Sequence, residues 1–198
     1  VLQQKNNQFD MTGNEHVVTM FNVTPDLHGM VVAHGVGFGK TGTGLAFATM
    51  WQHAPAIFIV CPPKMVQVWR KFLHKFAPDD VQKRVRLASY NDAYNQKSMD
   101  LAGHTQIFTE ADVSGSVYIV DEAHNVLPST STTKAGKWVY NAPRRDTNKG
   151  QNAAIYFDIL HANRVLLLSA TPLKGEFDDN FGLLLNAAIG YEYCPVGA

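Results

Sequence analysis

Short apolar runs recur along the chain, and they constrain its fold more than any other feature. They are GMVVA at 29–33, AIFIVC at 56–61, RVRLASY at 84–90, SVYIVDE at 116–122 and RVLLLSA at 164–170. Runs of this length and character are typical of strands that are buried on both faces, and most of the segments between them can form helices. We therefore predict an α/β fold in which a parallel sheet carries helices on both faces.

The length of the chain suits a single domain of ordinary size. Its 198 residues are 45% hydrophobic, which is enough to bury a full core. We expect an N-terminal extension at 1–28 that leads into one domain at 29–198. The apolar runs are far too short to cross a bilayer, so no membrane partner is expected. The expected helices cover about 41–52, 64–76, 152–162 and 178–189.

A glycine-rich loop, HGVGFGKTGTG at 34–44, follows the first apolar run. Glycine is favoured where the backbone is left-handed or where a ligand approaches closely. A strand, a glycine loop, a Lys-Thr pair and a helix together suit a polyphosphate: Lys40 reaches the outer phosphates and Thr41 can ligate magnesium. His34 replaces the first glycine of this pattern, and a glycine-rich turn with an incidental lysine is the alternative. The predicted nucleotide-binding residues are Gly35, Gly37, Phe38, Gly39, Lys40 and Thr41.

Two acidic residues end the fourth apolar run. Asp121 and Glu122 are expected at the carboxyl edge of a strand, where open α/β sheets bind their ligands. Asp121 would hold magnesium, directly or through water, and Glu122 would orient and deprotonate an attacking water. A strand cap or a turn is the alternative for such a pair. The position of the pair downstream of the glycine loop favours the magnesium and water roles over the cap or turn.

The last apolar run ends in small hydroxyl residues, within RVLLLSATPLKG. Ser169 and Thr171 suit a hydrogen-bond relay between a nucleotide site and a neighbouring surface. The alternative is a strand-to-turn junction that Pro172 ends. The glycine loop, the acidic pair and this motif occur in an order that favours a nucleotide-hydrolysing site.

A long polar segment at 129–152 separates the last two runs. Lysine plus arginine and aspartate plus glutamate number 17 each, so the net charge gives no support to a general polyanion-binding surface, and any nucleic-acid contact must be local. Basic residues interleaved with Trp138 and Tyr140 could contact a nucleic-acid backbone and its bases, whereas a solvated loop is the alternative. The basic residues are Lys134, Lys137, Arg144, Arg145 and Lys149.

The motifs together resemble those of helicase superfamily 2. HGVGFGKT, IVCPPKMVQVWRKF, RLASYNDAY, VYIVDEAH and LLLSATPLKG are similar to motifs I, Ia, a following tyrosine-containing motif, II and III. The resemblance runs from about residue 29 to 189. In style, the motifs are similar to those of the transcription ATPases and helicases of large DNA viruses and of chromatin-remodelling translocases. The resemblance implies a P-loop, RecA-like first domain of a nucleic-acid-dependent ATPase, with ATP and Mg²⁺ as cofactors.

The resemblance also implies roles for individual residues. Lys40 would bind phosphate and Thr41 magnesium. Asp121 would hold magnesium, Glu122 would orient and deprotonate water, and His124 would couple to motif III. The coupling residues of motif III are Ser169, Ala170 and Thr171, and the implied nucleic-acid contacts are Pro63, Lys64, Gln67 and Tyr90. Solvation of a helix N-terminus is the alternative for Lys64. We interpret Trp69 as a core anchor.

The chain departs from the family pattern in two places. The glutamine that usually reads adenine is missing upstream of the loop, where Gln8 is a substitute and Phe9 or Phe21 could stack on a base. Motifs IV to VI have no counterpart before Ala198, so arginines from a second RecA-like domain must come from elsewhere. We therefore expect the isolated chain to bind Mg-ATP, to hydrolyse it slowly and to unwind no duplex.

The expected partners are DNA or RNA, a second RecA-like domain in cis or in trans, and other proteins of a transcription or replication complex. With two cysteines there is no disulfide framework or zinc cluster, which favours an intracellular location, or a virion if the chain is viral. A packaging-type ATPase is an alternative function. Another is a nucleotide-binding structural or regulatory module of a larger virion or transcription assembly.

Overall fold

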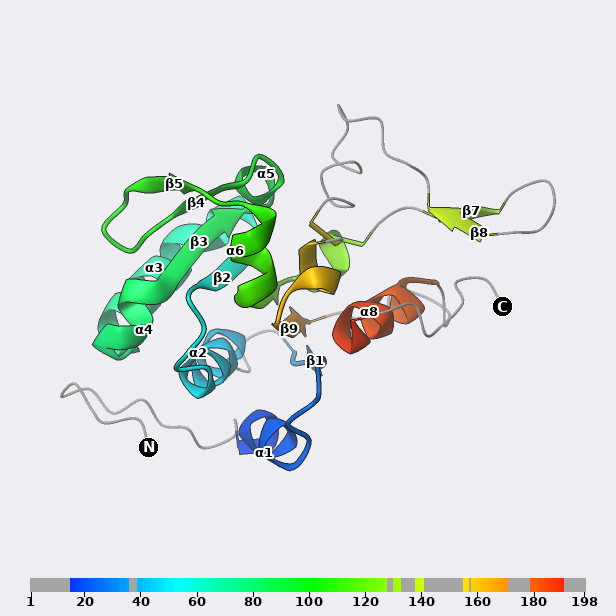
Figure 1. Cartoon of the computed structure of the whole chain (residues 1–198), viewed down its shortest axis with the longest axis horizontal. Coiled ribbons are helices and arrows are strands. Elements are labelled where there is room, and N and C mark those ends of the chain that lie inside the picture. Colours follow the sequence, from blue (N-terminus) through cyan, green and yellow to red (C-terminus); the bar gives the residue numbers. More distant parts are fainter. Residues whose placement is uncertain are drawn as a thin grey trace.

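A seven-stranded sheet forms the centre of the molecule (Figure 1). The computed structural model describes residues 15–35, 39–127, 130–132, 138–140, 155–156, 158–170 and 179–190. The strand order is β1-β9-β6-β2-β3-β4-β5. The parallel strands are β1 (Gly29–Ala33), β9 (Arg164–Ser169), β6 (Val117–Asp121), β2 (Ile57–Cys61) and β3 (Val85–Ser89). Each predicted apolar run is therefore a strand, and together they form the parallel part of the sheet.

An antiparallel hairpin extends one edge of this sheet. Strand β4 (Lys97–Met99) pairs with β3, and β5 (Thr105–Ile107) pairs with β4. This antiparallel edge adds to the predicted parallel sheet and is not anticipated from the sequence. Both strands are short, and β5 is exposed at every residue, so they carry no apolar run.

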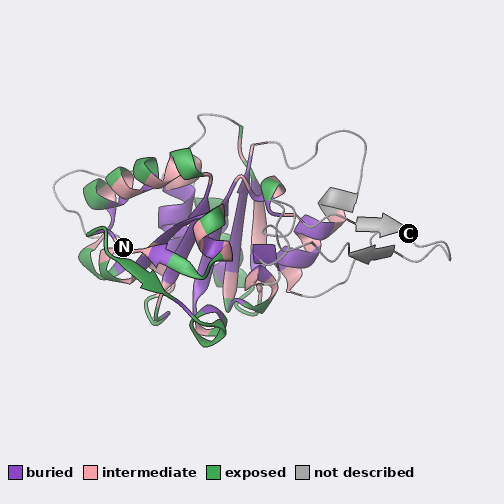
Figure 2. Cartoon of the chain, turned by 90° about the horizontal axis from the view of Figure 1, so that it is seen from above, coloured by how far each residue is buried: buried purple, intermediate pink, exposed green. Residues whose placement is uncertain are grey.

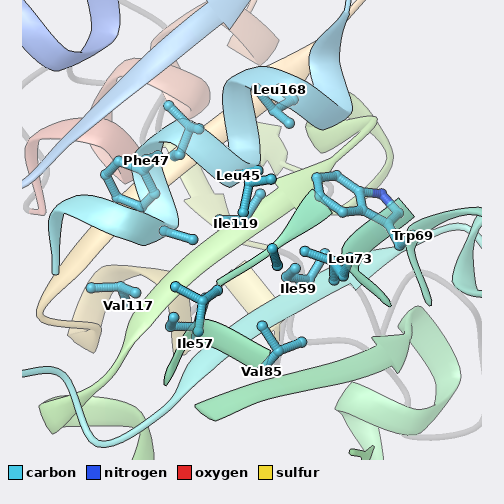
Figure 3. Close-up of a cluster of buried hydrophobic side chains, with 14 of the residues drawn as sticks. Leu45, Phe47, Ile57, Ile59, Trp69, Leu73, Val85, Val117, Ile119 and Leu168 are labelled. Atoms are coloured by element: carbon cyan, nitrogen blue, oxygen red, sulfur yellow. The ribbon is translucent and has the colours of Figure 1, made fainter. Parts of the chain in front are cut away.

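The central strands are buried on both faces. Strands β2 and β6 are buried at every residue, which explains their continuous apolar sequence (Figure 2). Side chains alternate between the two faces, so Ile59 and Ile119 belong to one core cluster, whereas Val60 and Val120 belong to the other. Figure 3 shows part of the first cluster, where strand residues meet Leu45 of one helix and Leu73 of another.

Helices cover both faces, as predicted. The first core cluster includes residues of α1 (Glu15–Val23), α2 (Lys40–Met50), α3 (Pro63–Phe76) and α4 (Asp79–Arg84). The second includes residues of α5 (Tyr90–Tyr94), α6 (Glu110–Gly115), the 3₁₀ turn η1 (Ala123–Asn125), the helical residues 155–156 and 158–161, and α8 (Asp179–Ile189). No described helix is both long enough and apolar enough to cross a membrane.

Helix α1 lies within the predicted N-terminal extension and packs onto the domain. Its Phe21 is 3% exposed, with ring centroids 5.1 Å from Phe47 and 5.7 Å from Trp51. Phe21 is thus a core residue, and the suggestion that it stacks on a base is wrong. Gln8 and Phe9 lie outside the described residues.

The basic segment at 129–152 contains two short strands. β7 (Thr130–Thr132) and β8 (Trp138–Tyr140) pair in antiparallel fashion as a separate sheet. The other residues of the segment fall outside the described ranges. Its contact with nucleic acid stays a prediction.

A cavity of about 440 Å³ lies between α6 and the helical residues 158–161. Glu110, Ser114, Asp158 and His161 are among its lining residues. Burial, together with the negative charge of Glu110, raises the pKa of Asp158 to about 6 against a partial opposing effect of His161. An unfolded aspartate titrates near 3.9, so the folded state binds the extra proton between about pH 4 and pH 6. The linked stability therefore falls as pH rises through this window.

Asp158→Asn is accordingly expected to stabilise the fold above pH 6, by roughly 1–2 kcal/mol after allowance for the partial exposure of the side chain. Urea unfolding at pH 4.5 and pH 7.5 measures this, because the gain over the wild-type chain should shrink at the lower pH. Asp26→Asn, at an exposed aspartate, is the control. The same gain at both pH values would contradict the prediction.

Candidate active site at the carboxyl edge of the sheet

Three sequence motifs end at one edge of the sheet. β1, β9 and β6 are adjacent and parallel, and their register pairs Ala33 with Ser169 and Asp121 with Leu168. The backbone N–H of His34 donates to the carbonyl of Ser169 at 3.1 Å, one residue beyond β1. Since parallel strands share the direction of their carboxyl ends, the glycine loop, the acidic pair and the hydroxyl motif meet at this edge.

The glycine loop leads into α2 through a left-handed residue. Gly39 has φ 78° and ψ 24°, and no atom lies within 4 Å of a Cβ built there, so conformation rather than space requires glycine. Gly39, the N-cap residue, has no side chain with which to cap α2, so the first N–H groups of the helix need another acceptor. Of the predicted loop residues, Gly35 follows β1 and Lys40 and Thr41 begin α2. Gly37 and Phe38 lie outside the described residues.

His34 contacts protein groups at the start of this loop. Its Nδ1 lies 3.5 Å from Oγ1 of Thr43, and its ring centroid lies 5.3 Å from that of His16. Burial, with the positive charges of His16 and Lys40, lowers the pKa of His34. These contacts favour a loop histidine over a nucleotide contact.

Lys40 and Glu122 form an ion pair across the edge. Lys40 Nζ lies 2.8 Å from Glu122 Oε1, and the two side chains are 15% and 29% exposed. Burial raises the pKa of Glu122, but the hydrogen bond and charge of Lys40, helped by His124 and the N–H of Ala170, outweigh it and lower the pKa overall. Glu122 is therefore a carboxylate at neutral pH, and it can accept a proton.

The Asp121 carboxylate is held by two N–H donors. Trp69 Nε1 donates to Oδ2 at 3.0 Å, and the backbone N–H of Glu122 donates to Oδ1 at 3.1 Å. Burial raises the pKa of Asp121 and the charge of Glu122 adds to this, whereas Trp69 and Lys40 oppose it. Each carboxylate oxygen has a further lone pair, with which it can still ligate a metal or accept a hydrogen bond from a metal-bound water.

The oxygen ligands at this edge suit magnesium better than a cation that needs all of its ligands from the protein. The described residues hold no group of three or more His, Cys, Asp or Glu side chains that could bind a metal. Magnesium is commonly held by one or two carboxylates together with substrate phosphates and water. Asp121, with Thr41 at the start of the facing helix, matches that chemistry.

A histidine links the acidic pair to the third motif. His124 Nδ1 lies 2.8 Å from Oγ of Ser169 and 3.6 Å from Oε2 of Glu122. Ser169 is fully buried at the end of β9, and Ala170 follows it. The predicted coupling residues His124 and Ser169 are therefore in contact, while Thr171 lies outside the described residues.

Two aromatic residues approach Asp121 more closely than the sequence indicates. Trp69, interpreted as a core anchor, is fully buried but also hydrogen-bonds the carboxylate. The hydroxyl of Tyr90 donates to the carbonyls of Asp121 at 2.6 Å and Glu122 at 3.2 Å. The Tyr90 hydroxyl thus supports the backbone of the acidic pair, and its contact with nucleic acid stays a prediction. Neither bond has a sequence signal, because each joins residues that are far apart in the chain.

The remaining predicted contacts lie at the start of α3. Pro63, Lys64 and Gln67 are exposed there, directly after β2. Exposure leaves them available to a ligand, and their role stays a prediction.

Comparison with known proteins gives two likenesses, and no family model matches the chain. Curated relatives named termination factor NPH-I homolog, from African swine fever virus isolates of a tick in South Africa and a warthog in Namibia, are 26% identical over 163 residues. The match covers 75% of this chain and 20% of each relative, so the chain spans about a fifth of their length.

A solved structure, the Sulfolobus solfataricus SWI2/SNF2 ATPase core in complex with dsDNA, has a similar fold. It aligns with a TM-score of 0.54 and 15% identity, over 90% of this chain and 34% of that one. The α/β, RecA-like fold is therefore confirmed. The two likenesses agree with the family resemblance of the sequence motifs.

Proposed function

We propose that this chain is the first RecA-like motor domain of a nucleic-acid-dependent ATPase, which couples hydrolysis of Mg-ATP to movement on DNA or RNA. The observation that carries the proposal is the 2.8 Å ion pair between Lys40 and Glu122, beside the buried carboxylate of Asp121. The residues that we propose as phosphate-binding lysine, magnesium ligand and general base are thus close together at the edge of a parallel sheet where ligands commonly bind.

The phosphates would lie at the start of α2. Lys40 and the backbone N–H groups of the first turn of α2 would bind them, and Asp121 and Thr41 would hold magnesium. The metal would supply charge neutralisation at the phosphates. A bound triphosphate would compete with Glu122 for Lys40 and release the Glu122 carboxylate. Glu122 could then take a proton from the attacking water.

Coupling to nucleic acid would run through two neighbouring elements. His124 touches Ser169 at 2.8 Å, so a change in charge at Glu122 would reach the end of β9. The exposed start of α3, with Lys64 and Gln67, would contact the tracked strand. The dsDNA in the SWI2/SNF2 structure favours DNA as the partner, and the name of the viral relatives favours a role in viral transcription.

A second RecA-like domain, in cis or in trans, would complete the site. An arginine supplied across such a site is worth about a thousand-fold or more in rate. Other proteins of a transcription complex would be the further partners, inside an infected cell or in a virion.

Titration calorimetry of the 198-residue chain with Mg-ATP tests the proposal. We expect one site, a raised melting temperature and slow hydrolysis, because the arginines of a second domain are not supplied. No heat of binding together with an unmoved melting temperature would overturn the proposal. Brisk turnover by this chain alone would contradict the predicted need for a second domain.

A further inference from the structure

Trp69 lies where α2, α3 and β6 meet. It is carried by α3, is 0% exposed, and belongs to the core cluster of Figure 3 with Leu45 of α2. A Cβ built at Gly44 of α2 would come within 2.5 Å of the indole Cη2 and 3.4 Å of Ile119 Cγ2 in β6. The indole ring therefore fills the space that a side chain at position 44 would need. This explains a glycine inside a helix, where glycine is otherwise unfavourable.

The polar edge of the same ring faces the candidate magnesium site. Trp69 Nε1 donates to Oδ2 of Asp121 at 3.0 Å, in a bond between two buried side chains that are 52 residues apart. The other oxygen of Asp121 accepts from the N–H of Glu122. With one donor on each oxygen, the plane of the carboxylate is set from both sides. Removal of the indole N–H would leave Oδ2 without this donor and the carboxylate free to rotate.

We propose that Trp69 is a positioning residue, whose indole N–H orients the Asp121 carboxylate for magnesium. This inference rests on the proposed function, because it takes Asp121 as the magnesium ligand. It assigns to Trp69 a role beyond packing: the ring is wedged against α2, which begins with Lys40, while its N–H holds the carboxylate at the end of β6. The distance between the lysine and the metal ligand is then set by a third element, α3.

Trp69→Phe tests this role, since phenylalanine keeps an aromatic ring but lacks the N–H. ATP binding is titrated by calorimetry at a series of magnesium concentrations. The variant is expected to need about ten-fold more magnesium for half-maximal tightening of ATP binding, in line with the loss of a group that orients a metal ligand. ATP affinity without magnesium should stay within about two-fold of wild type, because Lys40 is untouched.

Trp51→Phe is the matched control. Trp51 Nε1 is buried and has no hydrogen-bond partner among the described residues, so the same substitution removes an N–H that orients nothing. Its magnesium requirement should equal that of the wild-type chain. A purely structural role for Trp69 would lower the melting temperature of Trp69→Phe and leave its magnesium requirement equal to that of Trp51→Phe.

Gly44→Ala provides a second route if Trp69→Phe does not fold. The added Cβ would push the indole away from its place and lengthen its bond to Asp121, so the magnesium requirement should again rise. A wild-type magnesium requirement in a folded Trp69→Phe or Gly44→Ala chain would overturn the inference. Failure of the wild-type chain itself to bind Mg-ATP would instead overturn the proposed function.

Discussion

Replacing Glu122 with glutamine is expected to slow ATP hydrolysis by about a hundred- to ten-thousand-fold, which is the range for loss of a general base. Glutamine is nearly the same size, so it preserves the packing at the end of β6 but cannot take a proton. Its neutral oxygen is also a weaker partner for Lys40, which lies 2.8 Å from Glu122 in the wild-type chain. Mg-ATP should therefore bind at least as tightly as before, and the variant should trap it.

Single-turnover release of labelled phosphate, with protein in excess over ATP, resolves slow rates of this kind. Glu110→Gln is the control, because Glu110 is an exposed residue of α6 that lines the cavity next to Asp158. Glu122→Gln turnover within about three-fold of the control would remove Glu122 from the role of base. A motor should also lose its stimulation by nucleic acid in this variant, whereas a structural module would assemble unchanged.

Lys40→Ala is expected to weaken Mg-ATP binding by about 30- to 150-fold. Charge-assisted hydrogen bonds to phosphate contribute about 2–3 kcal/mol, and alanine removes them with the charge. The fold should change little, because the Lys40–Glu122 pair is partly exposed and its loss leaves Glu122 in contact with water. The loss should therefore appear in affinity and not in the melting temperature of the unliganded chain.

Calorimetric titration with Mg-ATP measures the loss, and Lys71→Ala serves as the control for removal of one positive charge, since Lys71 is exposed on α3. Equal affinities in the two variants would mean that Lys40 makes no phosphate contact. That result would also break the argument for the glycine loop, because Lys40 is its one described cation.

The parallel core of the fold could be predicted from the sequence, because strands buried on both faces have continuously apolar sequences. A strand such as β6 has no solvent face, so its sequence is apolar without alternation. The β4–β5 hairpin could not be predicted in this way, since β5 is exposed along its whole length. Helix α1 had a signal in the four-residue spacing of Val17 and Phe21, both buried, although it lies within the segment predicted as an extension.

The composition of the candidate site could be predicted, but its internal bonds could not. Strand ends placed Asp121 and Ser169 at one edge, because parallel strands finish together. The order of strands, with β9 between β1 and β6, follows only from pairing in three dimensions. The bond from Trp69 to Asp121 is hidden for another reason: tryptophan in an amphipathic helix is typical of a core, and nothing in its spacing reports where its N–H points.

The backbone of Glu122 has a consequence for how such a chain can evolve. It has φ 53° and ψ 48°, a left-handed conformation that costs a residue with a side chain about 1–2 kcal/mol and costs glycine almost nothing. Selection for fold stability alone would favour glycine or asparagine at this position. The glutamate found there instead indicates a trade-off between stability and chemistry, so redesign of this domain for stability should leave position 122 unchanged.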